Sequence, residues 1–170
     1  MMKSWHSICN SPSLKWTPPP GGNLKLNTNV AVHKDFEFIS VKVVIRNNSG
    51  LMVAVLSKSV MGLFFAEVEE YIALREDLML AKHLQVPFQW VEVGASNVIS
   101  RIYAKDSSLD VVGCIIDDIK SLCAEVRVVK CHAIPRDRNI VPHTLAARAV
   151  SSYEDDLWLD ARPFCVSSLS

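Results

Sequence analysis

The chain has 170 residues, of which 49% are hydrophobic and 21% are charged. This length and this composition predict a single globular domain with a buried core and exclude a disordered tail. Its 18 lysines and arginines are balanced by 18 aspartates and glutamates, so the chain lacks the broad basic field that attracts phosphates, and any nucleic-acid binding is expected to be local or weak.

The start of the chain is rich in serine and proline. Pro18–Gly22, three prolines followed by two glycines, predicts an extended arm and a turn, so residues 1–20 are interpreted as a flexible leader. Residues 1–22 contain no long apolar run, which argues against a signal peptide and a membrane anchor and predicts a cytoplasmic or nuclear protein. The five cysteines are scattered without a Cys-x-x-Cys pair. This pattern argues against a disulfide framework or a zinc site and predicts reduced, mostly buried thiols.

A meander of three strands is predicted next. Residues 24–31 alternate between apolar and polar side chains, and residues 38–46 are rich in β-branched residues, as strands are. Asn47–Gly50 is typical of a tight hairpin turn because asparagine and glycine accept positive φ angles. The chain is therefore expected to return as a third strand over residues 51–60.

Helical patterns follow the meander. Apolar residues recur at helical spacing over residues 64–84, with Pro87 just beyond, and this predicts a long central helix. Residues 88–93 are typical of a short strand, after which Ser96 is expected to cap a second helix and Asp110 a third.

The last part of the chain is expected to add one strand and one helix. Residues 125–131 alternate as in a strand, and a closing helix is predicted over residues 139–152, with Pro142 in its first turn. Residues 153–170 are expected to form a tail draped over the surface. The domain is thus placed at residues 21–152. Its predicted fold is α/β, with helices flanking a mixed five-stranded sheet whose first three strands are antiparallel and whose later strands are parallel.

Four segments of the sequence have an order and a spacing that are typical of one family. They are Trp16–Gly21 running into Lys25–Asn29, then Glu70–Glu76, then Trp90–Gly94, and finally His132, Arg136, Asn139 and His143–Ala146. Together they resemble the plant ribonuclease H-like domain, of the type often found in retroelement-derived open reading frames. The resemblance implies a ribonuclease H-like fold, an RNA/DNA hybrid as substrate or partner, and hydrolysis of the RNA strand with the help of paired Mg²⁺ ions.

The resemblance also assigns the four carboxylate positions that would hold two magnesium ions. On this chain these positions are Asn29, Glu70, Gly94 and His143. Only Glu70 keeps a carboxylate, whereas magnesium needs anionic oxygen ligands to shed its water. Each lost unit charge, at about 4 Å and an effective dielectric near 20, removes on the order of 4 kcal/mol of ion attraction. We therefore expect no metal cofactor and no hybrid cleavage through paired magnesium ions, with Glu70 as a vestigial ligand.

Several residues near these positions have two interpretations. Glu70 is also favoured by the dipole at the start of a helix. Glu92, which shares a strand face with Gly94, is either a substitute ligand or, as the resemblance favours, a structural residue. Lys42-Val43 stands where the family usually has two glycines, so close approach of a ligand to the backbone would be hindered. The loop after His132 is one residue longer than in the family, and no proton-transfer role is assigned to this histidine.

Two further sets of residues leave alternatives open. His143, His132 and Glu70 would suit zinc, although their spacing alone does not bring them together. The other set consists of Arg136, Arg138 and Arg148. These arginines are either remnant phosphate contacts or, as the neutral total charge favours, part of an ordinary solvated helix face. Beside a non-catalytic nucleic-acid-binding domain, the sequence allows an active nuclease with a rearranged site. It also allows an interaction module or decaying reading frame with no nucleic-acid role.

Overall fold

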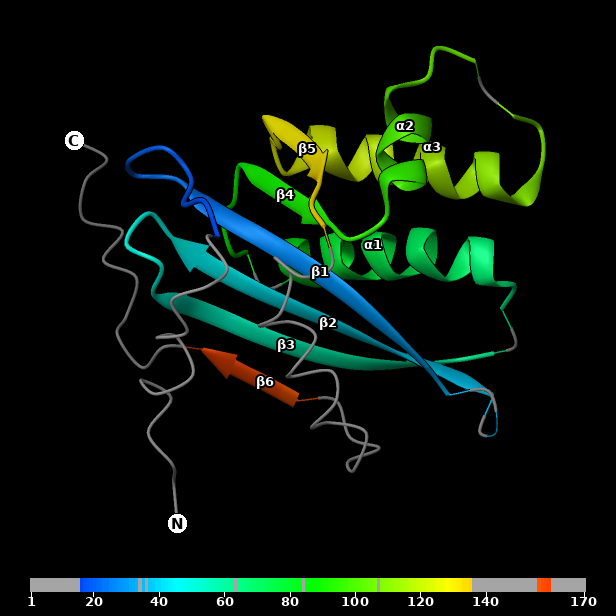
Figure 1. The fold of residues 1–170 in the computed structure, drawn as a ribbon, viewed down its shortest axis with the longest axis horizontal. Coiled ribbons are helices and arrows are strands. Elements are labelled where there is room, and N and C mark those ends of the chain that lie inside the picture. Colours follow the sequence, from blue (N-terminus) through cyan, green and yellow to red (C-terminus); the bar gives the residue numbers. More distant parts are fainter. Residues whose placement is uncertain are drawn as a thin grey trace.

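The computed structural model describes residues 16–33, 35, 37–62, 64–83, 85–106, 108–135 and 156–159. One six-stranded sheet crosses the domain in the order β5-β4-β1-β2-β3-β6 (Figure 1). Its strands are β1 (Leu24–His33), β2 (Phe38–Asn47), β3 (Met52–Met61), β4 (Trp90–Val93), β5 (Lys130–Ala133) and β6 (Asp156–Leu159). The described helices are α1 (Ala66–His83), α2 (Ser96–Tyr103) and α3 (Val111–Glu125).

The sheet is mixed, as predicted. β1 pairs with β2 and β2 with β3 in antiparallel register, whereas β1 and β4, and β4 and β5, are parallel. These five strands confirm the predicted sheet. The sixth strand, β6, pairs antiparallel with β3 along its outer edge. Residues 156–159, which the sequence placed in a surface tail, therefore extend the sheet.

The hairpin between β2 and β3 confirms the predicted turn. Gly50 donates its backbone N–H to the Asn47 carbonyl at 3.0 Å and has a φ of 78°, in the left-handed region that glycine adopts without steric penalty. The Asn47 side chain accepts from the backbone N–H groups of Ser49 and Leu51. The turn thereby satisfies its own backbone groups and sets the register of the two strands.

Several predicted boundaries differ from the structure by a few residues, and two of the differences have a local cause. Ser96 is the first residue of α2 and not its cap, because the cap position belongs to Ala95, whose side chain makes no capping hydrogen bond. The strand predicted from residue 125 begins only at Lys130, since α3 continues through Glu125 and Arg127 then turns the chain with a φ of 61°. Asp110 caps α3 as predicted, accepting a hydrogen bond from the Gly113 N–H at 2.7 Å.

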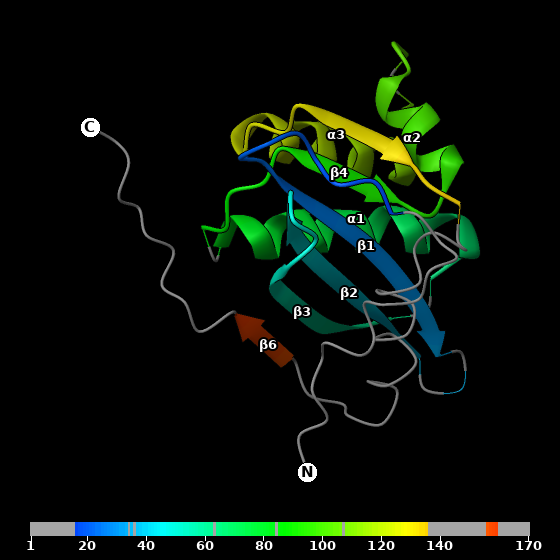
Figure 2. The ribbon, with the colours of Figure 1, turned by 60° about the vertical axis from the view of Figure 1, so that its left-hand side comes forward.

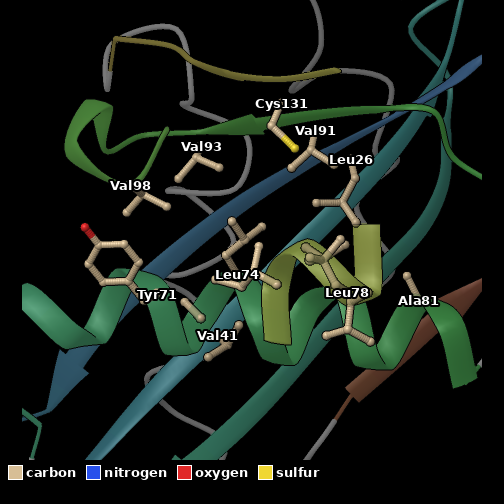
Figure 3. Packing of buried hydrophobic residues seen from close by; sticks show 14 of the residues in the cluster. Leu26, Val41, Tyr71, Leu74, Leu78, Ala81, Val91, Val93, Val98 and Cys131 are labelled. Carbon is tan, nitrogen blue, oxygen red and sulfur yellow. The ribbon is translucent and has the colours of Figure 1, made fainter. Parts of the chain in front are cut away.

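The core lies between the sheet and the helices, with α1 packed against β1, β2 and α3 (Figures 1 and 2). Figure 3 shows part of this layer, with Leu26, Val91 and Cys131 from the strands and Leu74 and Leu78 from α1, all of them buried. Strand side chains alternate between two faces. The face of β1 that carries Leu26 and Thr28 is directed at α1, and the face that carries Lys25, Asn27 and Asn29 is directed away from it.

The predicted closing helix over residues 139–152 lies outside the described residues, and so does His143. Within the described part, no helix has the length and the apolar character needed to cross a bilayer.

Candidate active site

Two of the predicted site residues directly follow the last parallel pair of β1 and β4. The last parallel pair of these strands is Thr28 with Val93, and Asn29 and Gly94 are the residues that follow this pair along the chain. β1 then continues to His33, paired with β2 alone. Crevices at the carboxyl ends of parallel strands are where open α/β sheets usually bind ligands. The end of this parallel ladder, followed by Asn29 and Gly94, is therefore the candidate site.

The amide of Asn29 is partly enclosed. The side-chain nitrogen Nδ2 of Asn29 is buried and has no hydrogen-bond partner in the described part of the structure. On its other side Asn29 is directly opposite Lys42 of β2, whose side chain is only 2% exposed. Directly opposite residues of an antiparallel pair project from the same face. Lys42 therefore shares the face, and the location, of Asn29.

Glu70 lies on α1, half-buried, two helical turns before Asp77. Asp77 accepts a hydrogen bond from the Thr28 hydroxyl, which fixes this face of α1 against β1. Burial, and to a smaller extent the nearby charges of Glu76 and Glu70, raise the pKa of Asp77 well above its usual value, and the Thr28 hydrogen bond opposes that shift. Glu70 is thus on the helix face that meets β1, and it belongs to an acidic stretch.

Glu92 is the centre of a buried polar network on the sheet face that points away from α1. Its Oε1 accepts from Lys25 Nζ at 2.6 Å, and its Oε2 accepts from Asn27 Nδ2 at 2.5 Å. Asn27 in turn accepts from Arg46 Nη2 at 3.0 Å. Burial raises the pKa of the Glu92 carboxyl, but hydrogen bonds from His132, Lys25 and Asn27 outweigh it and hold this pKa below its usual value. With both oxygens engaged by donors, the contacts of Glu92 favour the structural interpretation of this residue.

His132 is a strand residue held by that network. It is paired with Glu92 across β4 and β5, and its Nε2 lies 2.9 Å from Glu92 Oε1. The ring also meets Trp90 edge-on, with centroids 6.1 Å apart. His132 is therefore held by a strand and by the Glu92 carboxylate, whereas a histidine on a loop would be free to move. The structure therefore gives His132 a positioning role beside Glu92.

Trp16 closes one side of the same network. Its ring lies 4.0 Å from Arg46 Cζ and 5.3 Å from Lys25 Nζ, both in cation–π geometry. Lys25 Nζ also donates to the Thr17 carbonyl at 2.6 Å. Residues 16 and 17, which the sequence assigned to the leader, thus contact β1 and β2. Sequence reasoning missed this network, although the alternation of Lys25 and Asn27 opposite Leu26 placed both polar residues on one face.

In the described ranges no group of three or more His, Cys, Asp or Glu side chains could hold a metal ion. The zinc alternative of His143, His132 and Glu70 stays a prediction, because His143 lies outside the described residues. Three arginines and one asparagine from the closing segment lie outside them too, namely Arg136, Asn139, Arg138 and Arg148.

The strand order β3-β2-β1-β4-β5, antiparallel and then parallel, with helices packed on the sheet, is that of a ribonuclease H-like domain. The chain belongs to the reverse transcriptase-like family, whose model matches residues 27–149. No protein with a curated description matches the sequence.

Solved structures agree with this fold. The ribonuclease H1 LC11, solved with an RNA/DNA hybrid, is 18% identical, with a TM-score of 0.62 over 75% of this chain and 96% of that one. The ribonuclease H1 of Halobacterium salinarum is 17% identical, with a TM-score of 0.59 over 76% and 98%. The N-terminal ribonuclease H domain of a Mycobacterium tuberculosis protein is 15% identical, with a TM-score of 0.60 over 76% and 94%. At these identities the likeness concerns the fold.

Proposed function

We propose that this chain is a nucleic-acid-binding domain, descended from an RNA/DNA-hybrid ribonuclease of plant retroelement type, whose metal-dependent cleavage has been lost. One observation carries the proposal. The point where β1 and β4 separate, which the family pattern assigns to two aspartates, holds Asn29 and Gly94. The reaction would need carboxylates there to hold the metal ions.

The donor set at this point does not fit paired magnesium ions. Asn29 offers a neutral amide and Gly94 has no side chain, so neither supplies the negative charge that helps magnesium lose its water. Glu70 is the one carboxylate kept among the described positions of the family pattern. The neighbouring Lys42 adds a positive charge to the same sheet face. These residues therefore cannot hold the paired magnesium ions that hydrolysis of the RNA strand would need.

Nucleic-acid binding is the part of the family activity that this chemistry still allows. Binding a backbone needs surface complementarity and local positive charge, and it does not need the metal. A ribonuclease H1 of the same fold was solved with an RNA/DNA hybrid, which supports a hybrid as the first ligand to test. Since the chain carries 18 cationic and 18 anionic side chains, the expected affinity is modest and falls with salt.

A cleavage assay tests the loss of catalysis. The natural chain and Glu70→Ala are incubated with an RNA/DNA hybrid in Mg²⁺ or Mn²⁺, beside an active ribonuclease H1. We expect neither chain to cleave the RNA strand above the background without protein. Metal-dependent cleavage by the natural chain that disappears in Glu70→Ala would mean a working, rearranged site and would overturn the proposal.

A gel-shift titration tests the binding function. Labelled hybrid and duplex DNA of one sequence are compared at low and at physiological salt. A hybrid shift that weakens as salt rises is the expected result. An absent shift, or one that salt does not change, would contradict nucleic-acid binding and favour an interaction module instead.

A further inference from the structure

Two thiols lie close together where α3 ends and β5 begins. Cys123 belongs to the last turn of α3, and Cys131 is the second residue of β5. Their sulfur atoms are 3.9 Å apart, and both cysteines are free thiols. Two sulfurs in contact form a pair that oxidation can join, unlike a single buried thiol. The function proposed above does not use this pair, so an inference about it stands apart from that function.

The turn between α3 and β5 makes the contact. Arg127 follows the end of the helix and reverses the chain with a φ of 61°. The N–H of Val128 then donates to the Cys123 carbonyl at 2.9 Å. On the strand, the Tyr103 hydroxyl lies 3.0 Å from both the backbone N and the backbone O of Cys131. Hydrogen bonds therefore hold the backbone at both cysteines, and the fold itself keeps the two sulfurs together.

We propose that Cys123 and Cys131 are a redox site, which a hydroperoxide oxidises to a reversible disulfide that joins α3 to β5. In the first step the Cys123 sulfur attacks the O–O bond, so that an S–O bond forms, the O–O bond breaks, and an alcohol or a water leaves. In the second step the Cys131 sulfur attacks the resulting sulfenic acid at sulfur. The S–S bond forms, the S–O bond breaks, and a water leaves with the Cys131 proton. Two thiols are thus oxidised and one peroxide is reduced.

The surroundings of the two thiols assign the two steps. Cys123 is half-buried, whereas Cys131 is directed from β5 into the core (Figure 3), so a peroxide reaches Cys123 first. The hydrogen bond with Cys131 lowers the pKa of the Cys123 thiol, although burial opposes this effect, and the thiolate is the form that reacts. The contact with Cys123 and, to a smaller extent, burial raise the pKa of Cys131. The effect of Cys123 ends when it becomes an uncharged sulfenic acid, which leaves Cys131 as the second nucleophile.

The distance between the sulfurs suits a disulfide that forms within the folded chain. Because a disulfide bond is about 2.05 Å long, the sulfurs must approach by about 1.9 Å from their separation of 3.9 Å. Rotation about the Cα–Cβ bonds of two cysteines moves their sulfurs over distances of this order. The disulfide would then tie α3 to the strand whose His132 lies 2.9 Å from the Glu92 carboxylate.

A peptide map of the full chain tests the disulfide without any substitution. Reduced protein is treated with equimolar hydrogen peroxide, its remaining thiols are alkylated, and it is digested with trypsin without a reductant. Trypsin separates Cys123, in residues 121–127, from Cys131, in residues 131–136, and from Cys114. A disulfide therefore joins two peptides that mass spectrometry identifies, and dithiothreitol should separate them again.

The same treatment in concentrated urea is the control for closeness in the sequence. Cys123 is eight residues from Cys131 and lies at a similar distance along the chain from Cys114, so both links should form at similar frequency when the fold is lost. In the folded chain we expect the link to Cys131 to exceed the link to Cys114 by at least about tenfold. No link between Cys123 and Cys131 in the folded chain, or equal frequencies of the two links there, would overturn the proposal.

Single variants test the order of the steps. Cys131→Ser keeps a hydroxyl beside Cys123 but cannot close the disulfide, so dimedone should trap the Cys123 sulfenic acid at least about tenfold more than in the natural chain. Cys114→Ser, which removes an exposed thiol from the same helix, is the matched control and should still form the disulfide. Circular dichroism confirms that both variants fold. Equal trapping at Cys123 in the natural chain and in Cys131→Ser would contradict the proposal.

Discussion

Lys25 and Glu92 form an ion pair of 2.6 Å between β1 and β4, with both side chains only 3% exposed. The pair joins neighbouring parallel strands two residues away from their direct register, since Lys25 is opposite Trp90 and Glu92 is opposite Asn27. Asn27 and His132 complete the shell around the carboxylate. Removing one partner would leave the other charged and buried.

The first prediction concerns this pair. Glu92→Ala should lower the free energy of unfolding by about 3–5 kcal/mol, because Lys25 would remain buried without its counter-charge. Urea denaturation measures the change. The exposed pair of Lys82 and Glu125, about half exposed at each side chain, is the control, and Glu125→Ala should change stability by about 0–1 kcal/mol. Similar losses in both variants would contradict the prediction.

The second prediction concerns acid. The pKa of Glu92 is lowered in the folded protein, because hydrogen bonds from His132, Lys25 and Asn27 outweigh the effect of burial. Because this pKa is lower in the folded than in the unfolded protein, the ionised Glu92 carboxylate stabilises the fold at pH values above its unfolded pKa near 4.5. This stability is lost as the pH falls through the pKa of the folded protein. Glu92→Gln should therefore be less stable than the natural chain at neutral pH but lose less on acidification. Urea midpoints from about pH 6 to about pH 3 measure this, and parallel curves for the two proteins would refute it.

The third prediction concerns Asp77, whose pKa is shifted in the opposite direction to that of Glu92. Burial raises the pKa of Asp77. The stability that the protonated Asp77 carboxyl contributes is therefore fully present below its unfolded pKa near 3.8, and it is lost as the pH rises through the pKa of the folded protein. Asp77→Asn keeps an acceptor for the Thr28 hydroxyl and removes the charge. We expect a higher melting temperature at neutral pH, by about 2–4 °C for each kcal/mol gained. Asp118→Asn, on an exposed aspartate, is the control and should leave it unchanged. A lower melting temperature in Asp77→Asn would contradict the prediction.

The fourth prediction concerns thiol reactivity. Cys123 and Cys131 lie with their sulfur atoms 3.9 Å apart, and Cys131 is buried. The contact with Cys123, together with burial, raises the pKa of Cys131, which leaves little of the reactive thiolate. Of the described cysteines, exposed Cys114 should be alkylated first and Cys131 last. Peptide mass spectrometry of the folded protein, with Cys114→Ser to identify the fast site, measures the order, and early modification of Cys131 would contradict it.

The fifth prediction concerns Trp16. Its ring covers the Arg46 guanidinium at 4.0 Å, and such contacts contribute about 0.5–2 kcal/mol. Trp16→Ala should destabilise the domain by at least this amount, because packing is lost as well, whereas Trp16→Phe should keep a large part of it. Denaturation curves of the two variants provide the comparison. Equal losses would show that the aromatic face does not contribute.

Local patterns predicted most of the secondary structure. Alternation defined β1, the Asn47–Gly50 signal defined the hairpin, and Asp110 was recognised as the cap of α3, because each depends on residues close together in the chain. The wrong predictions concern the ends of helices and strands, where neighbouring residues are compatible with more than one structure and the pattern alone does not choose between them. Ser96 has the chemistry of a cap but is the first residue of α2, and the residues that alternate like a strand begin with the last residue of α3 and the turn that follows it.

The sequence by itself determined which residues stand at the family positions, including the amide at Asn29 and the missing side chain at Gly94. Only the tertiary structure decided what lies beside them. Strand register places Lys42 opposite Asn29 and His132 opposite Glu92, and it brings Lys25 to a carboxylate 67 residues away along the chain. Long-range partners of this kind depend on how the strands pair, and pairing is set by the whole sheet and its packed face, not by any one segment.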